Sequence, residues 1–166
     1  MNFERIQTIA IETVMDSKTK EVLLTLGLVV IPFVWSGPQL LVGSVVNMLL
    51  CLTAANSQPK SWWIKAALPS LAVVARGGLF SSFTPYLLYL WPIITLGNWV
   101  FMSIGQSKLK VLAKIKLPVA AITKMVILMT GATVLAQLKI IPGAMVGSMG
   151  IIQLVTALIG GMLAAL

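Results

Sequence analysis

The sequence predicts an all-α integral membrane protein, built as a six-helix transmembrane bundle with a short amphipathic helix before it. Of its 166 residues, 58% are hydrophobic and 10% are charged, and the mean hydropathy is +1.00. Soluble domains of ordinary composition are far less apolar. Apolar runs of the length that crosses a bilayer recur along the chain, and loops rich in Ser, Gly, Pro, Asn and Lys separate them. We therefore expect one compact bundle without a separate soluble domain.

Residues 1–20 form the first expected element. Ile6, Ile9 and Val14 fall on one helical face, whereas most of the charged side chains lie elsewhere. This pattern predicts a short amphipathic helix that lies on the membrane surface. A cytoplasmic extension of the first span fits the same pattern.

The single transmembrane domain is expected to cover residues 21–166. Its apolar runs lie at about 22–36, 38–56, 62–80, 85–105, 117–137 and 140–166. The first run is short, and Pro32 is expected to bend or end it early. The second run of each consecutive pair opens with a proline, which suits the first turn of a helix: Pro38, Pro85 and Pro142.

The charge distribution predicts the topology. All four acidic residues lie within the first 21 positions, and nine basic residues with no acid follow. Lys60 and Lys65 flank the second loop, and the fourth loop carries Lys108, Lys110, Lys114 and Lys116. Because cytoplasmic loops are enriched in Lys and Arg, both loops and both termini are expected on the cytoplasmic side. The net charge of +8 is thus a topology signal and does not indicate nucleic-acid binding.

Enzymatic activity is not expected, and neither is a cofactor or a metal site. The chain has no histidine, and no acid follows Glu21, so paired carboxylates, a Ser-His-Asp triad and ordinary metal sites are missing from the apolar runs. A Ser/Lys dyad that uses Lys124 is the one catalytic alternative left. The single cysteine, Cys51, is interpreted as a small buried hydrophobe.

Three amides lie deep within apolar runs. Asn47, Asn98 and Gln153 stand nine to thirteen residues beyond the prolines that open their runs, or roughly 14 to 20 Å into the membrane. An unpaired amide in hydrocarbon costs several kcal/mol, so each is expected to face protein, water or a solute. Asn98 also follows Gly97, with Pro92 nearby, which predicts a kinked helix beside a cavity. Hydrogen bonding between helices is the alternative.

Two cations lie within the apolar runs. Arg76 is expected roughly 20 Å from the inner interface and Lys124 about 10 Å from it, so one small ligand is not expected to touch both. Each is a candidate solute contact. The alternative is that Arg76 extends to the outer headgroups and Lys124 to the cytoplasmic ones. Trp91 is a candidate for stacking on a solute, with core or interface packing as the alternative.

The directions of the helices add an electrostatic argument. The second, fourth and sixth spans are expected to begin at the outer face, so their positive dipole ends point outward together with Arg76. An external pocket built there would favour a carboxylate or another anion.

Several stretches resemble the substrate-binding S components of energy-coupling-factor (ECF) transporters. These stretches are VGSVVNMLL at 42–50, LGN at 96–98, ITKMVIL at 122–128 and IIQLVTALIGGMLA at 151–164. The resemblance implies a multi-pass protein of a prokaryotic cell membrane that captures a small micronutrient from outside. It places the ligand among the first external loop and helices four to six, which here correspond to Trp35, Gln39, Asn98, Gln153 and Thr156.

The resemblance also implies partners. Transport would need a membrane T component and two ATPase subunits, because this chain has no GxxxxGK[ST] loop with which to bind ATP. The first span departs from the family, since it offers only Gly27 where small residues at four-residue spacing dock on the T component. Ala66 and Ser70 in the third span keep that spacing. A non-transport structural or assembly protein, and a solitary small carrier or channel, are the alternative functions.

Overall fold

The computed structural model describes residues 16–35, 37–77, 81–108 and 115–166, and over these ranges the chain is helical without a strand. The α-helices are α2 (Ser17–Val34), α3 (Gln39–Ala55), α4 (Trp62–Arg76), α5 (Leu87–Gly105), α6 (Lys116–Gln137), α7 (Ala144–Met149) and α8 (Ile151–Leu163). Two 3-10 helices, η1 (Pro59–Ser61) and η2 (Ser81–Tyr86), precede α4 and α5. The surface helix expected at residues 1–20 lies mostly outside the described residues, and α2 already begins at Ser17.

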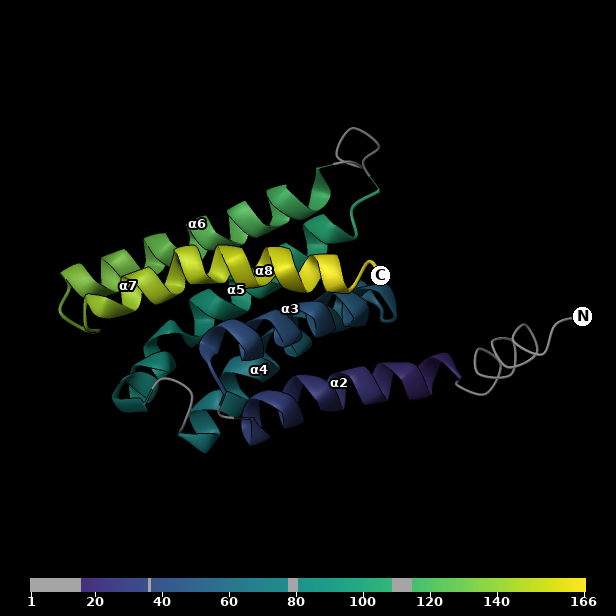
Figure 1. Ribbon diagram of the computed structural model, residues 1–166, viewed down its shortest axis with the longest axis horizontal. Coiled ribbons are helices and arrows are strands. Elements are labelled where there is room, and N and C mark those ends of the chain that lie inside the picture. Colours follow the sequence, from purple (N-terminus) through teal and green to yellow (C-terminus); the bar gives the residue numbers. More distant parts are fainter. Residues whose placement is uncertain (1–15, 36, 78–80, 109–114) are drawn as a thin grey trace, which may run out of the picture.

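The helices lie side by side along the long axis of the molecule (Figure 1). Helices α6, α7 and α8 form one side, α3 and α5 lie in the middle, and α4 and α2 form the other side. The most extensive helix pairs are α3 with α8, α5 with α6, α4 with α5 and α2 with α4. The start of α2 and the end of α8 lie at the same end of the bundle (Figure 1).

Three helical segments are long and apolar enough to cross a membrane: Thr84–Gly105, Lys116–Gln137 and Ala144–Leu163. Helix α3 is apolar but shorter, and α4 has 15 residues. At 1.5 Å per residue α4 spans roughly 22 Å, less than the ~30 Å of a typical hydrocarbon core. The structure thus gives an all-helical bundle with three candidate spans among the described residues.

Prolines and glycines lie both inside the helices and at their ends. Helix α2 continues two residues past Pro32, and α5 is one helix through both Pro92 and Gly97. Gly77 adopts a left-handed conformation, with φ of 76°, and ends α4 directly after Arg76. The last run was expected to form one spanning helix, and its segment Ala144–Leu163 is long and apolar enough to cross a membrane. Gly150, with ψ of −104°, divides this segment into α7 and α8.

The closest approach between helices is that of α3 and α8. A Cβ atom at Gly160 would lie 2.4 Å from the Ser44 carbonyl oxygen and 2.7 Å from Asn47 Cβ. No larger residue fits at position 160 without separating the two helices. This contact holds α8 against the part of α3 that carries Asn47.

Candidate functional site

A cavity of about 80 Å³ lies among the helices, close to the deepest polar side chains. We call it the amide-lined cavity. Its polar lining residues are Gln39 and Asn47 from α3, Ser70 from α4, Asn98 from α5, Lys124 from α6 and Gln153 from α8. The remaining wall is apolar, with Pro32, Val73, Leu87 and Met149 among its residues. Five of the nine predicted site residues therefore line one cavity, although they come from four different helices.

Lys124 is the charged group of this cavity. Its side chain is buried, with 2% of the residue exposed, and Nζ donates a hydrogen bond to Asn47 Oδ1 over 2.5 Å. Nζ also lies 5.3 Å from the centre of the Phe101 ring, within the range of a cation–π contact. Lys124 therefore does not extend to the cytoplasmic headgroups in this structure, because its ammonium group is buried and bonded to Asn47.

No carboxylate compensates this charge within the described residues. The one ion pair found there joins Lys65 to Glu21, at a different place in the bundle. An ammonium group carries three donors, and Lys124 makes one hydrogen bond to a described residue. The cavity therefore has a buried cation with unused donor capacity beside it.

The orientation of the Asn47 amide is fixed by its own donors. Asn47 Nδ2 donates to the Gly43 carbonyl oxygen over 2.9 Å and to Thr156 Oγ1 over 3.2 Å. The Thr156 hydroxyl in turn donates to the Gln153 carbonyl oxygen over 3.1 Å. With both amide hydrogens engaged, Oδ1 must point toward Lys124. Thr156, another predicted site residue, thus lies directly behind the cavity wall and contributes indirectly.

The other two amides have different surroundings. Asn98 is 3% exposed and its Nδ2 donates to the Ala66 carbonyl oxygen over 2.9 Å, which ties α5 to α4. Gln153 is half-buried and lies three residues past the helix break at Gly150. Gln39 Nε2 approaches the Ser148 carbonyl oxygen at 3.5 Å, the long limit of a hydrogen bond. The discontinuity between α7 and α8 therefore lies at the cavity, where broken helices in membrane proteins are commonly found.

Besides Thr156, three predicted site residues do not line the cavity. Trp35, at the end of α2, is 43% exposed. Arg76, at the end of α4, is half-buried, and its Nη1 is buried without a hydrogen-bond partner among the described residues. The buried Nε1 of Trp91 has no such partner either. Of the two residues predicted around the connection between α2 and α3, Trp35 and Gln39, only Gln39 lines the cavity.

Other lining residues were not predicted as site residues. Ser70 was interpreted with Ala66 as a small-residue docking pair, but both are buried, at 6% and 0% exposure, and Ala66 accepts the hydrogen bond from Asn98. Phe101, beneath Lys124, was also missed. Its position three residues after Asn98 places it near the same helical face, which was the available signal.

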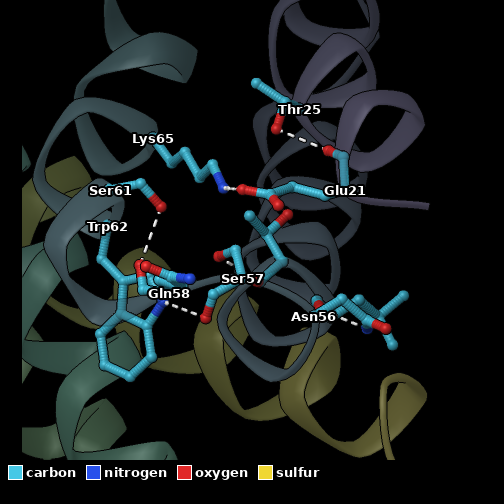
Figure 2. A network of polar contacts seen from close by, with 10 residues as sticks. Glu21, Thr25, Asn56, Ser57, Gln58, Ser61, Trp62 and Lys65 are labelled. Atoms are coloured by element: carbon cyan, nitrogen blue, oxygen red, sulfur yellow. Dashed lines mark hydrogen bonds and ion pairs between the residues drawn. The ribbon is translucent and has the colours of Figure 1, made fainter. Parts of the chain in front are cut away.

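A second buried lysine lies toward the end of the bundle that holds the α3–α4 connection. Figure 2 shows Lys65 of α4 reaching across to the Glu21 carboxylate of α2, above the connection between α3 and α4. In that connection Ser61 donates to the Gln58 carbonyl oxygen over 2.8 Å, and Trp62 Nε1 donates to the Ser57 carbonyl oxygen over 3.3 Å (Figure 2). Lys65 thus has a counterion, unlike Lys124.

Comparison of this chain with protein-family models, with curated proteins and with solved structures finds no match. Among the described residues no group of His, Cys, Asp and Glu side chains could hold a metal ion.

Proposed function

We propose that this protein is a membrane-embedded solute-binding component that captures a small anionic or carboxylate-bearing micronutrient at the outer face of a prokaryotic cell membrane. In this proposal all six apolar runs cross the membrane and both ends of the chain face the cytoplasm. The proposal keeps the resemblance to ECF S components as its working model. Its support comes from one feature of the amide-lined cavity.

That feature is the pairing of Lys124 with an amide instead of a carboxylate. A buried cation without a counterion is costly, and its cost falls when an anion binds beside it. Asn47 presents its oxygen to Lys124 at 2.5 Å, which orients the ammonium group but leaves its charge in place. Gln153 and Asn98 add amide groups to the same lining, and amides can hydrogen-bond a polar solute.

The size of the cavity restricts the solute. Its volume is about 80 Å³, whereas sites for drug-sized molecules measure roughly 300 to 1,000 Å³. A carboxylate group with one or two waters fits this space. A larger acid would have to place the rest of its structure toward Gln39 and the outer ends of the helices, or displace side chains.

The proposed partners are a T component and two ATPase subunits in other chains. Docking through Ala66 and Ser70 is not part of the proposal, because both residues pack inside the bundle. Helix α2 offers an exposed apolar face instead, with Val22, Leu26, Val30 and Phe33 each at least 46% exposed. Lipid covers such a face equally well, so the partners stay a proposal from resemblance.

The direct experiment compares an acid with its neutral amide. The purified protein in detergent is titrated with nicotinate and nicotinamide, and with propionate and propionamide, by calorimetry. We expect each acid to bind at least tenfold more tightly than its amide. Equal affinity for acid and amide would contradict the role of Lys124. Mass spectrometry of small molecules that co-purify with the protein then identifies the natural solute.

A structural or assembly role is the second candidate, and the hydrogen bond from Asn98 to the Ala66 carbonyl oxygen favours it. Such bonds between membrane helices contribute about 0.6 kcal/mol on average and need no solute. Under this reading no acid binds, and exchange of Asn98 or Gln153 changes thermal stability alone.

A further inference from the structure

A second cavity, of about 240 Å³, lies between α3, α5, α6 and α8. We call it the apolar cavity. Its wall is mostly aliphatic and aromatic and includes Cys51, Phe101, Met102, Leu117 and Ala120. Lys116, which is half-buried, and Gln106 are its polar lining residues. The proposed binding function makes no use of this cavity.

The two cavities follow one another along the same helices. Cys51 lies four residues after Asn47, Met102 four residues after Asn98, and Ala120 four residues before Lys124. In each pair the first-named residue lines the apolar cavity and the second lines the amide-lined cavity. Four residues of α-helix advance about 6 Å. The cavities are therefore separated by about one helical turn on three neighbouring helices.

Three buried side chains that contact one another lie in the interval between them, and we call them the layer. Lys124, Asn47 and Phe101 are 2%, 1% and 1% exposed. Lys124 Nζ bonds to Asn47 on one side and lies over the Phe101 ring on the other. Phe101 also lines the apolar cavity, so the underside of this layer is an aromatic ring.

The backbone around the layer is closely packed. Helices α3 and α8 approach closely at Gly160, and a Cβ at Gly43 would lie 2.9 Å from Thr156 Cγ2. These two helices therefore cannot move closer together. Movement of the Lys124 stem and rotation of the Phe101 ring are the changes that would join the cavities while the helices stay in place.

We propose that the two cavities are halves of one passage for small monovalent anions, closed in this conformation by the layer of Lys124, Asn47 and Phe101. The passage rests on the anion site of the proposed function but goes beyond it, because it lets the chain conduct without ATPase partners. Lysines face both cavities, and no Asp or Glu among the described residues lines either one. Cationic side chains select anions in pores, and hydrophobic constrictions close them.

The experiment measures anion flux through the purified chain alone in liposomes. Chloride and formate entry is followed by an enclosed fluorophore, with valinomycin and potassium to balance charge. Phe101→Ala removes the aromatic barrier, and we expect it to raise anion flux at least tenfold over the wild type without raising sodium flux. The double variant Phe101→Ala, Lys124→Met should lose the preference for anions over sodium.

Leu90→Ala is the matched control, because Leu90 is also buried in α5, at 0% exposure, but lines neither cavity. If the anion flux of Phe101→Ala is no higher than that of Leu90→Ala, the proposal of a passage is wrong. If nicotinate still binds in that case, the proposed function survives; if neither flux nor acid binding is found, both fail. Phe101→Leu replaces Phe101→Ala if the latter does not elute as a monodisperse protein, with an expected rise of at least threefold.

Cys51 gives a second readout, since it is the one cysteine of the chain and lines the apolar cavity. Right-side-out vesicles are treated with the membrane-impermeant anionic reagent sulfonatoethyl methanethiosulfonate, and the mass of the purified protein is measured. Modification in Phe101→Ala should be at least tenfold faster than in the wild type, and faster than with the cationic trimethylammonioethyl reagent. Equal rates in the two proteins would contradict a continuous path.

Discussion

Two buried lysines occupy opposite electrostatic environments in this protein. Lys65 has a side chain that is 7% exposed and pairs with Glu21, whose side chain is 36% exposed. Lys124 is equally buried but has an amide oxygen, an aromatic ring and a cavity around it. The first charge is paired with a carboxylate, whereas the second has no carboxylate partner among the described residues.

The comparison separates structural from functional charge. An ion pair such as that of Lys65 and Glu21 joins α2 to α4 and gains from keeping both partners. The arrangement at Lys124 lowers the cost of the charge only partly, through the Asn47 dipole, and so favours an incoming anion. A lysine thus joins two helices at one site and, in our proposal, binds an anionic solute at the other.

The largest expected effect comes from Lys124→Met. This change removes the charge but keeps a long apolar stem, and we expect nicotinate affinity to fall at least 100-fold, about 2.8 kcal/mol at 1.4 kcal/mol per tenfold. The free energy of unfolding should change by less than ~1 kcal/mol, because loss of a donor to Asn47 offsets relief of an unpaired charge. Calorimetry and denaturation in detergent measure the two quantities.

Lys65→Met is the matched control for that exchange. It removes the other buried lysine, and nicotinate affinity should stay within about twofold of the wild type. An equal loss of affinity in both variants would mean that the two lysines act through general stability, and the distinction between them would fail.

The next prediction concerns a variant in which Lys124 has a carboxylate partner, as Lys65 does. Asn47→Asp gives Lys124 a carboxylate partner like that of Lys65, so acid binding should weaken at least tenfold, about 1.4 kcal/mol, as the new carboxylate competes with the solute. Asn47→Leu removes the same amide without adding charge and should retain acid binding. Unchanged affinity in Asn47→Asp would show that the solute does not approach Lys124.

A stability effect without a binding effect is expected at the other lysine. Glu21→Gln leaves Lys65 buried without its counterion, and because Glu21 is partly exposed we expect a loss of about 2 kcal/mol, below the 3 to 5 kcal/mol typical of fully buried pairs. Thermal denaturation in detergent measures it. The double variant Glu21→Gln, Lys65→Met should recover part of that loss, and additive losses would contradict a coupled pair.

The sequence predicted helix positions better than side-chain directions. Long apolar runs and opening prolines located α3, α5 and α6 within a few residues, because hydrophobic continuity and proline chemistry are local properties. The burial of Lys124 depends on Asn47, which is 77 positions away, and on the α3–α8 packing that places it. Spacing along one helix contains no such information, so both the buried and the extended lysine were consistent with it.

The break at Gly150 was unpredictable for a related reason. The last apolar run contains five glycines, Gly143, Gly147, Gly150, Gly160 and Gly161, and any of them could interrupt a helix. The neighbours at these positions do not single out Gly150 either: a Cβ there would lie 3.3 Å from the Met129 sulfur, whereas a Cβ at Gly160, where α8 continues, would lie 2.4 Å from the Ser44 carbonyl oxygen. The local sequence does not specify these neighbours.

The smallest expected effect concerns Arg76, the other cation that the sequence analysis placed within an apolar run beside Lys124. Its guanidinium has a buried Nη1 without a partner among the described residues, so it shares with Lys124 the lack of a counterion there. It does not line the amide-lined cavity. If the position at the cavity is what makes a cation functional, Arg76→Gln should change nicotinate affinity less than twofold. A loss comparable to that of Lys124→Met would show that the missing counterion alone, and not the cavity, marks the anion site.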